Sequence, residues 1–156
     1  MDHVKLASDI EQAVNSACDE FIALSDDVVQ RRTTSDEWSI KEIIGHLVDS
    51  ASNNHQRWVR LQIADDLGFP DYQEDNEKWV RIQQYNDRTW ESLLALWRYF
   101  NLHLAAIIRG VNLECLQHVW VMDEVNTVTL RDLMVDYLRH LEMHLEQIRK
   151  NLRCAA

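Results

Sequence analysis

Apolar residues recur every three or four positions along four segments of the chain, the period of an α-helix with one buried face. The four segments span residues 4–29, 39–64, 88–109 and 129–152. In the last segment the apolar positions form a heptad row made of Met134, Leu138, Leu141, Leu145, Ile148 and Leu152. We therefore predict four long helices, each with a face that must be buried against the others.

The start of the second helix is marked by local signals. Ser39 followed by Glu42 forms a capping box, and Trp38 with Ile43 occupies the flanking positions of a hydrophobic staple. A weaker version of the same pattern begins the fourth helix at Thr129. These signals fix where two of the helices begin, and so which residues share a level along each helix.

The connections between the helices differ in length. Residues 65–87 form a long connection between the second and third helices, with a short helix expected around residues 79–85; such a segment is typical of a crossover or a functional lid. Residues 112–128 are expected to form a loop or a short irregular hairpin. With three Gly and one Pro in 156 residues, the chain is poor in turn formers. We predict an all-α fold, one four-helix bundle domain over residues 1–156 with a long crossover between helices 2 and 3.

The charge of the chain limits its partners. A formal net charge of −10 at pH 7 disfavours nucleic acid and anionic membrane surfaces. No apolar run reaches the ~18 residues of a membrane span, and the first residues lack the apolar stretch of a signal peptide. Three scattered cysteines give no disulfide framework. These observations favour a cytoplasmic protein that acts on a small molecule.

Two histidines in the fourth helix have the spacing of metal ligands. His140 and His144 lie four residues apart at the edge of the apolar stripe, so their Cβ atoms are ~6 Å apart on one face. His46 holds a matching position in the second helix. It lies ~10 Å from the start of that helix, and His144 lies ~10 Å from the end of the fourth. If the two helices run antiparallel, the three histidines meet at one level.

Three neutral imidazoles with a vacant fourth position are typical of a catalytic divalent metal site. Zinc or nickel suits such a site, as do iron and manganese. Asp49, Asn53 and Gln147, together with Glu42, are candidates for hydrogen bonds to the ligand histidines. A zincin motif and a di-iron ExxH pair fit worse, because Leu141 stands where a zincin has glutamate and the sequence contains no ExxH. The remaining histidines, which are His3, His55, His103 and His118, are interpreted as surface or packing residues.

The motifs WSIKEIIGHLVDS and VTLRDLMVDYLRHLEMHLEQI resemble the second and last helices of the DinB-like superfamily, and PDYQEDNEKWVRIQQYNDRTWESLLALW resembles its connection into helix three. The resemblance implies a metal-binding four-helix bundle with His46, His140 and His144 as ligands. Because dimers are common in the family, it also suggests a homodimer. One departure is Leu145, where many relatives carry a further histidine.

The resemblance also suggests a function. Relatives include metal-dependent transferases and isomerases that use a low-molecular-weight thiol such as bacillithiol or mycothiol. We therefore expect a metal-dependent enzyme, with thiol S-transfer as the leading hypothesis. The alternatives are a metal-dependent hydrolase, in which the same site activates water, and a non-catalytic metal- or ligand-binding protein of a stress response.

Overall fold

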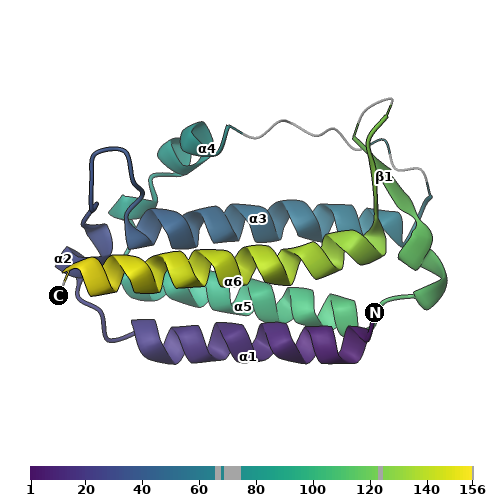
Figure 1. Cartoon of the computed structure of the whole chain (residues 1–156), viewed down its shortest axis with the longest axis horizontal. Coiled ribbons are helices and arrows are strands. Elements are labelled where there is room, and N and C mark those ends of the chain that lie inside the picture. The colour runs from purple at the N-terminus through teal and green to yellow at the C-terminus, as the bar shows by residue number, and fades with distance from the viewer. Residues whose placement is uncertain (66–67, 69–74, 123–124, 156) are drawn as a thin grey trace.

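Four long helices lie side by side along the longest axis of the molecule (Figure 1). The computed structural model describes residues 1–65, 68, 75–122 and 125–155. The long helices are α1 (His3–Phe21), α3 (Ile40–Leu61), α5 (Trp90–Arg109) and α6 (Leu130–Ala155). The shorter helices are α2 (Asp26–Gln30) and α4 (Asn76–Gln83), with 3-10 turns η1 (Tyr85–Asp87) and η2 (Leu113–Gln117). The predicted four-helix bundle is confirmed.

The crossover determines the direction of the helices. Helix α4 and turn η1 lie beside the beginning of α3, so α5 starts at the same end as α3 and runs in the same direction (Figure 1). Helices α1 and α6 run the opposite way. Because α3 and α6 are antiparallel neighbours, residues near the start of α3 lie level with residues in the second half of α6.

The first predicted helix is wrong in one respect, because it is two helices. Helix α1 ends at Phe21, and α2 begins after Ser25 with Asp26 and Asp27 in its first turn. The indole of Trp90 donates a hydrogen bond of 2.9 Å to the main-chain oxygen of Phe21. This tertiary bond satisfies a carbonyl at the end of α1, and local periodicity carries no sign of it.

Other helix boundaries differ from the predicted ones by a few residues. Helix α3 ends at Leu61, three residues earlier than expected, and α5 begins after the N-cap Thr89. The short helix expected around residues 79–85 lies earlier, as α4, and is followed by η1. Strands β1 (Val119–Val121) and β2 (Thr127–Thr129) pair antiparallel, so the hairpin alternative was correct for residues 112–128.

Gly45 is required for the connection into α5 to pack on α3. A Cβ atom at this position would lie 2.1 Å from Cδ2 of Tyr85, whose side chain is buried. The Tyr85 hydroxyl donates to Asp49 Oδ1 at 2.7 Å, and the amide of Gln83 also donates to that oxygen. One face of α3 therefore holds α4 and η1 in place.

Residues 66–67 and 69–74 of the connection, on which the lid hypothesis partly rests, lie outside the described residues.

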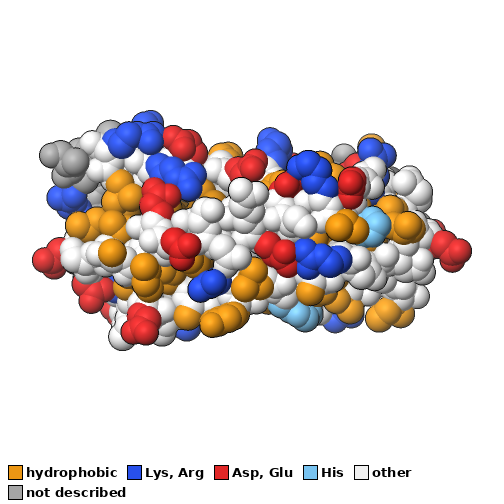
Figure 2. Space-filling view, turned by 90° about the horizontal axis from the view of Figure 1, so that it is seen from below, with side chains coloured by type: hydrophobic (Ala, Val, Ile, Leu, Met, Phe, Trp, Pro, Cys, Tyr) orange, Lys and Arg blue, Asp and Glu red, His pale blue; other side chains and the backbone are white. Residues whose placement is uncertain are grey.

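One face of the molecule carries acidic and basic side chains in small groups. On the face seen from below in Figure 2, acidic and basic side chains are interspersed among hydrophobic ones. None of the described helices combines the length and hydropathy that crossing a membrane requires.

Replacement of Gly45 by alanine tests this packing. We expect Gly45→Ala to lower the free energy of unfolding by about 2 kcal/mol, because the ring of Tyr85 must move and its bond to Asp49 is disturbed. Urea denaturation followed by circular dichroism measures the loss. Gly110→Ala is the matched control, since its Cβ would meet Ala106 O at an ordinary 3.6 Å. Equal stability of Gly45→Ala and the wild type would contradict the packing argument.

Candidate metal centre

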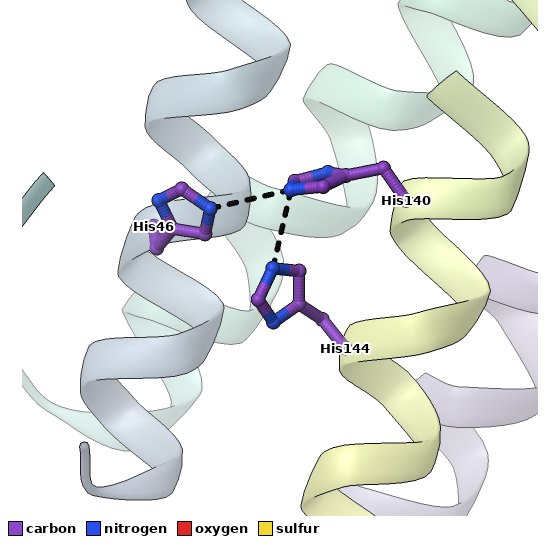
Figure 3. Close-up of side chains that lie close together, drawn as sticks. All are labelled: His46, His140 and His144. Atoms are coloured by element: carbon purple, nitrogen blue, oxygen red, sulfur yellow. Dashed lines mark hydrogen bonds between the residues drawn. The ribbon is translucent and has the colours of Figure 1, made fainter. Parts of the chain in front are cut away.

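The start of α3 holds His46 at a defined place in the bundle. Ser39 Oγ accepts a hydrogen bond from the main-chain N–H of Glu42, and the Glu42 carboxylate accepts one of 2.8 Å from the N–H of Ser39. This capping box fixes the helix start as the sequence indicates. His46 lies two turns later and is 7% exposed. Its ring points from α3 toward α6 (Figure 3).

The structure brings the three predicted histidines together (Figure 3). His140 Nε2 lies 3.4 Å from His46 Nε2 and 3.1 Å from His144 Nε2. One ring nitrogen from each residue lies within 4.8 Å of the others, and no carboxylate or thiol of the described residues joins this cluster. We call these three residues the histidine cluster.

The spacing of the ring nitrogens fits a shared cation. Two nitrogens that bind one zinc ion at ~2.1 Å in tetrahedral geometry lie ~3.4 Å apart. The two measured separations of 3.1 Å and 3.4 Å are close to that value. The three rings are therefore close enough to share one ion, and a fourth ligand can come from outside the protein.

Burial keeps the cluster neutral. Burial, together with the nearby imidazoles of His144 and His140, lowers the pKa of His46 to about 3. Burial likewise lowers the pKa of His140 to about 4 and lowers the pKa of His144, whose bond to Gln147 acts the other way. At neutral pH the rings are uncharged, which is the form that binds a metal ion.

Of the residues predicted to support the ligands, Gln147 contacts the cluster directly. Its Oε1 lies 2.9 Å from His144 Nδ1. Because a carboxamide oxygen accepts, the proton of His144 is placed on Nδ1 and the lone pair of Nε2 faces the cluster. Asp49 instead joins α3 to Tyr85, and Glu42 binds Arg32 at 2.5 Å. Asn53 is half-buried on α3.

The other histidines lie elsewhere. His55 and His103 face one another with ring centroids 5.3 Å apart, and His118 Nδ1 lies 2.6 Å from Leu61 O. His3 is the first residue of α1.

One aromatic residue contacts the cluster in a way that the sequence did not indicate. The ring of Trp38, predicted only as part of a staple, lies 5.1 Å from the ring of His46.

A cavity of about 610 Å³ adjoins the cluster and was missed by sequence reasoning. It is bounded by α3, α6 and the β1–β2 hairpin, and His140 is part of its wall. On α3 its lining residues Ser50, Asn54 and Arg57 recur at intervals of four and three. That polar stripe continues the face of His46 and could have been recognised. The part contributed by the hairpin residue Trp120 depends on tertiary packing and left no local signal.

Bundles of this kind build metal and ligand sites from side chains on facing helices, and the histidine cluster lies in such a position. The family to which this bundle belongs follows from its sequence. The chain belongs to the DinB superfamily, whose family model matches residues 11–148. No curated protein matches it in sequence.

Two solved structures are similar to this bundle. YfiT from Bacillus subtilis, described as a probable metal-dependent hydrolase with an unusual four-helix bundle topology, is 16% identical with a TM-score of 0.86. That match covers 98% of this chain and 87% of YfiT. The mycothiol-dependent maleylpyruvate isomerase is 9% identical with a TM-score of 0.75. This chain, matched over 95% of its length, spans 61% of the isomerase. At identities this low, the two TM-scores show that the fold is shared and show nothing about activity.

The contact between Gln147 and His144 gives a test of metal binding. We expect Gln147→Met to weaken binding of zinc by roughly 10- to 100-fold, because the imidazole loses the acceptor that orients it. Gln147→Glu keeps an acceptor at that position and should retain most of the affinity. Calorimetric titration of the metal-free proteins with zinc measures the difference. The same affinity in Gln147→Met and the wild type would show that the contact does not support the ligand.

Proposed function

We propose that this protein is a metal-dependent enzyme that transfers a low-molecular-weight thiol to a small electrophile. The observation that carries the proposal is the convergence of three neutral imidazoles beside a cavity large enough for a small molecule. His46, His140 and His144 would hold one divalent metal ion, with zinc or nickel as the first candidates. When bound, such a cation lowers the pKa of a coordinated thiol or water and so supplies a nucleophile at neutral pH.

The residues around the cluster support thiol transfer in particular. A thiol bound to such a cation would lose its proton without a general base, and the cluster contains no carboxylate among the described residues. In the reaction the thiolate sulfur forms a bond to an electrophilic carbon, the bond to the leaving group breaks, and the leaving group departs with the electron pair. The thiol proton passes to solvent. The structure of the mycothiol-dependent isomerase is consistent with thiol chemistry on this fold.

Neither of the two cysteine side chains that the structure describes is suited to act as the nucleophile. Cys18 is buried, and burial raises its pKa to about 11. Cys115 is also buried, and its sulfur faces the main-chain oxygen of Gln62 at 3.7 Å. A thiol with a raised pKa in an apolar site is a poor nucleophile. A small thiol that enters through the cavity is therefore the better candidate.

Hydrolysis is a second candidate, and Asp136 is the observation that favours it. Its carboxylate lines the same cavity as His140, one turn before that ligand, and its charge raises the pKa of His140. A carboxylate in this place could accept a proton from an attacking water molecule. Asp136 is, however, exposed and bound by Arg139 at 2.5 Å, which makes it a weaker base.

Conjugation assays on metal-reconstituted protein test the proposal. Chlorodinitrobenzene serves as the electrophile, with bacillithiol, mycothiol, glutathione and cysteine as thiols, each with and without zinc or nickel. We expect metal-dependent conjugation with at least one thiol, and its loss in His46→Ala at unchanged circular dichroism. His55→Ala, on the same helix but away from the cluster, should keep the activity.

Two results separate the candidate reactions. Metal-dependent cleavage of esters or amides without any thiol, reduced in Asp136→Asn, would replace thiol transfer by hydrolysis. Stoichiometric metal uptake with neither reaction across both panels would favour a non-catalytic binding protein. Conjugation that survives chelation of the metal would contradict the proposed role of the histidine cluster.

A further inference from the structure

Trp38 joins the histidine cluster to the start of α3. It directly precedes the N-cap residue Ser39, and its half-buried ring packs against the hydrophobic core. In a hydrophobic staple such a residue packs over the fourth helical position, which is Ile43 in this helix. His46 lies three residues after Ile43 and is therefore its neighbour on the same face of α3. A large ring over Ile43 thus reaches His46 as well, about one turn further along the helix.

The contact between the two rings has the geometry of an aromatic pair. The ring centroids of Trp38 and His46 lie 5.1 Å apart, and the ring planes are inclined by 46°. Aromatic rings attract one another at centroid separations of ~4.5–7 Å when they are offset or tilted rather than stacked face to face. His46 is 7% exposed, so the indole belongs to the shell that covers this ligand. The indole therefore limits the directions in which the imidazole can turn.

Two of the three rings of the cluster are held by a residue outside it. His144 is held through Nδ1, which lies 2.9 Å from Gln147 Oε1. His46 is held by the ring contact with Trp38 and presents Nε2 to His140 Nε2 at 3.4 Å. Helix α6 thus supports its ligand by a hydrogen bond, and the segment before α3 supports its ligand by packing.

This packing bears on metal affinity. A histidine ring that turns freely in the metal-free protein loses that freedom when it binds an ion, and the loss of entropy weakens binding. A ring that is already fixed with its nitrogen toward the ion avoids most of this cost. The apolar shell around a metal site also controls how far water reaches the ligands.

The surroundings of Trp38 make it a suitable position for substitution. Its side chain lines a second cavity, of about 510 Å³, whose lining also includes the exposed residues Lys78 and Arg81 of α4. A smaller side chain at position 38 enlarges this cavity and leaves no enclosed void in the core. We therefore expect variants at this position to fold, so that an effect on His46 can be separated from a loss of structure.

We propose that Trp38 is the positioning residue of His46, and that its indole holds the imidazole in the rotamer that turns Nε2 toward His140 and His144. The effect on metal affinity rests on the metal centre of the function proposed above. The effect on the rotamer of His46 does not, because it exists in the metal-free protein.

NMR of the metal-free protein with labelled histidine tests the rotamer. The couplings between the Hα and Hβ protons of His46 should report one χ1 rotamer in the wild type. Trp38→Leu should average them over several rotamers, because leucine keeps an apolar side chain at the staple position but removes the ring. Trp38→Phe should restore a single rotamer. The matched control is Trp79→Leu, which removes a half-buried tryptophan of a separate cavity and should leave the couplings unchanged.

Metal titrations of the same variants measure the consequence for the site. Trp38→Leu should weaken zinc binding by roughly 3- to 10-fold, the range expected for the loss of one aromatic contact. Trp38→Phe and Trp79→Leu should bind zinc as the wild type does. In the cobalt-loaded protein, Trp38→Leu should also change the visible absorption bands, which depend on the arrangement of the ligands. A purely structural role at the start of α3 would lower the melting temperature and leave these bands unchanged.

The outcomes separate this assignment from the proposed function. A single His46 rotamer in folded Trp38→Leu would overturn the assignment, and so would averaged couplings accompanied by an unchanged zinc affinity. If the wild type takes up neither zinc nor cobalt, the proposed function fails, and the NMR series alone decides whether Trp38 fixes the ring of His46.

Discussion

The antiparallel contact between α3 and α6 is the constraint on which the rest of the site depends. It places His46 Nε2 3.4 Å from His140 Nε2, although the two residues are 94 positions apart in the chain. A shift of α6 by one residue would move its side chains by ~1.5 Å along the axis and ~100° around it. The histidine cluster and the cavity beside it both need this same register.

Several contacts fix α3 relative to the elements that surround its first half. The capping box at Ser39 fixes the start of α3, and Gly45 allows Tyr85 to pack against the helix. At the same end Lys41, which is buried, donates to Arg88 O at 2.8 Å and lies 3.0 Å from Asp26 Oδ1. These contacts join α2, α3 and the turn before α5. The site is therefore built on rigid helices rather than on loops, which favours defined ligand geometry.

The sequence predicted the helices and the convergence of His46 with His140 and His144 because both follow from helical geometry. Spacing places two imidazoles on one face, and capping signals give the level of the third. The break after Phe21 could not be predicted, since the bond from Trp90 that accompanies it is tertiary. Gly45 precedes His46 in the sequence, but its role depends on Tyr85, forty residues later. The hairpin side of the cavity could not be predicted for the same reason, because Trp120 reaches Arg57 only after the hairpin forms.

The most direct test of the central claim is X-ray absorption spectroscopy of the zinc- or nickel-loaded protein, combined with elemental analysis of the metal content. We expect one ion per chain with three imidazole nitrogens in its coordination shell, and weaker imidazole scattering in His46→Ala. A protein that takes up no stoichiometric divalent metal would contradict the claim. So would a bound ion surrounded by oxygen ligands without imidazole.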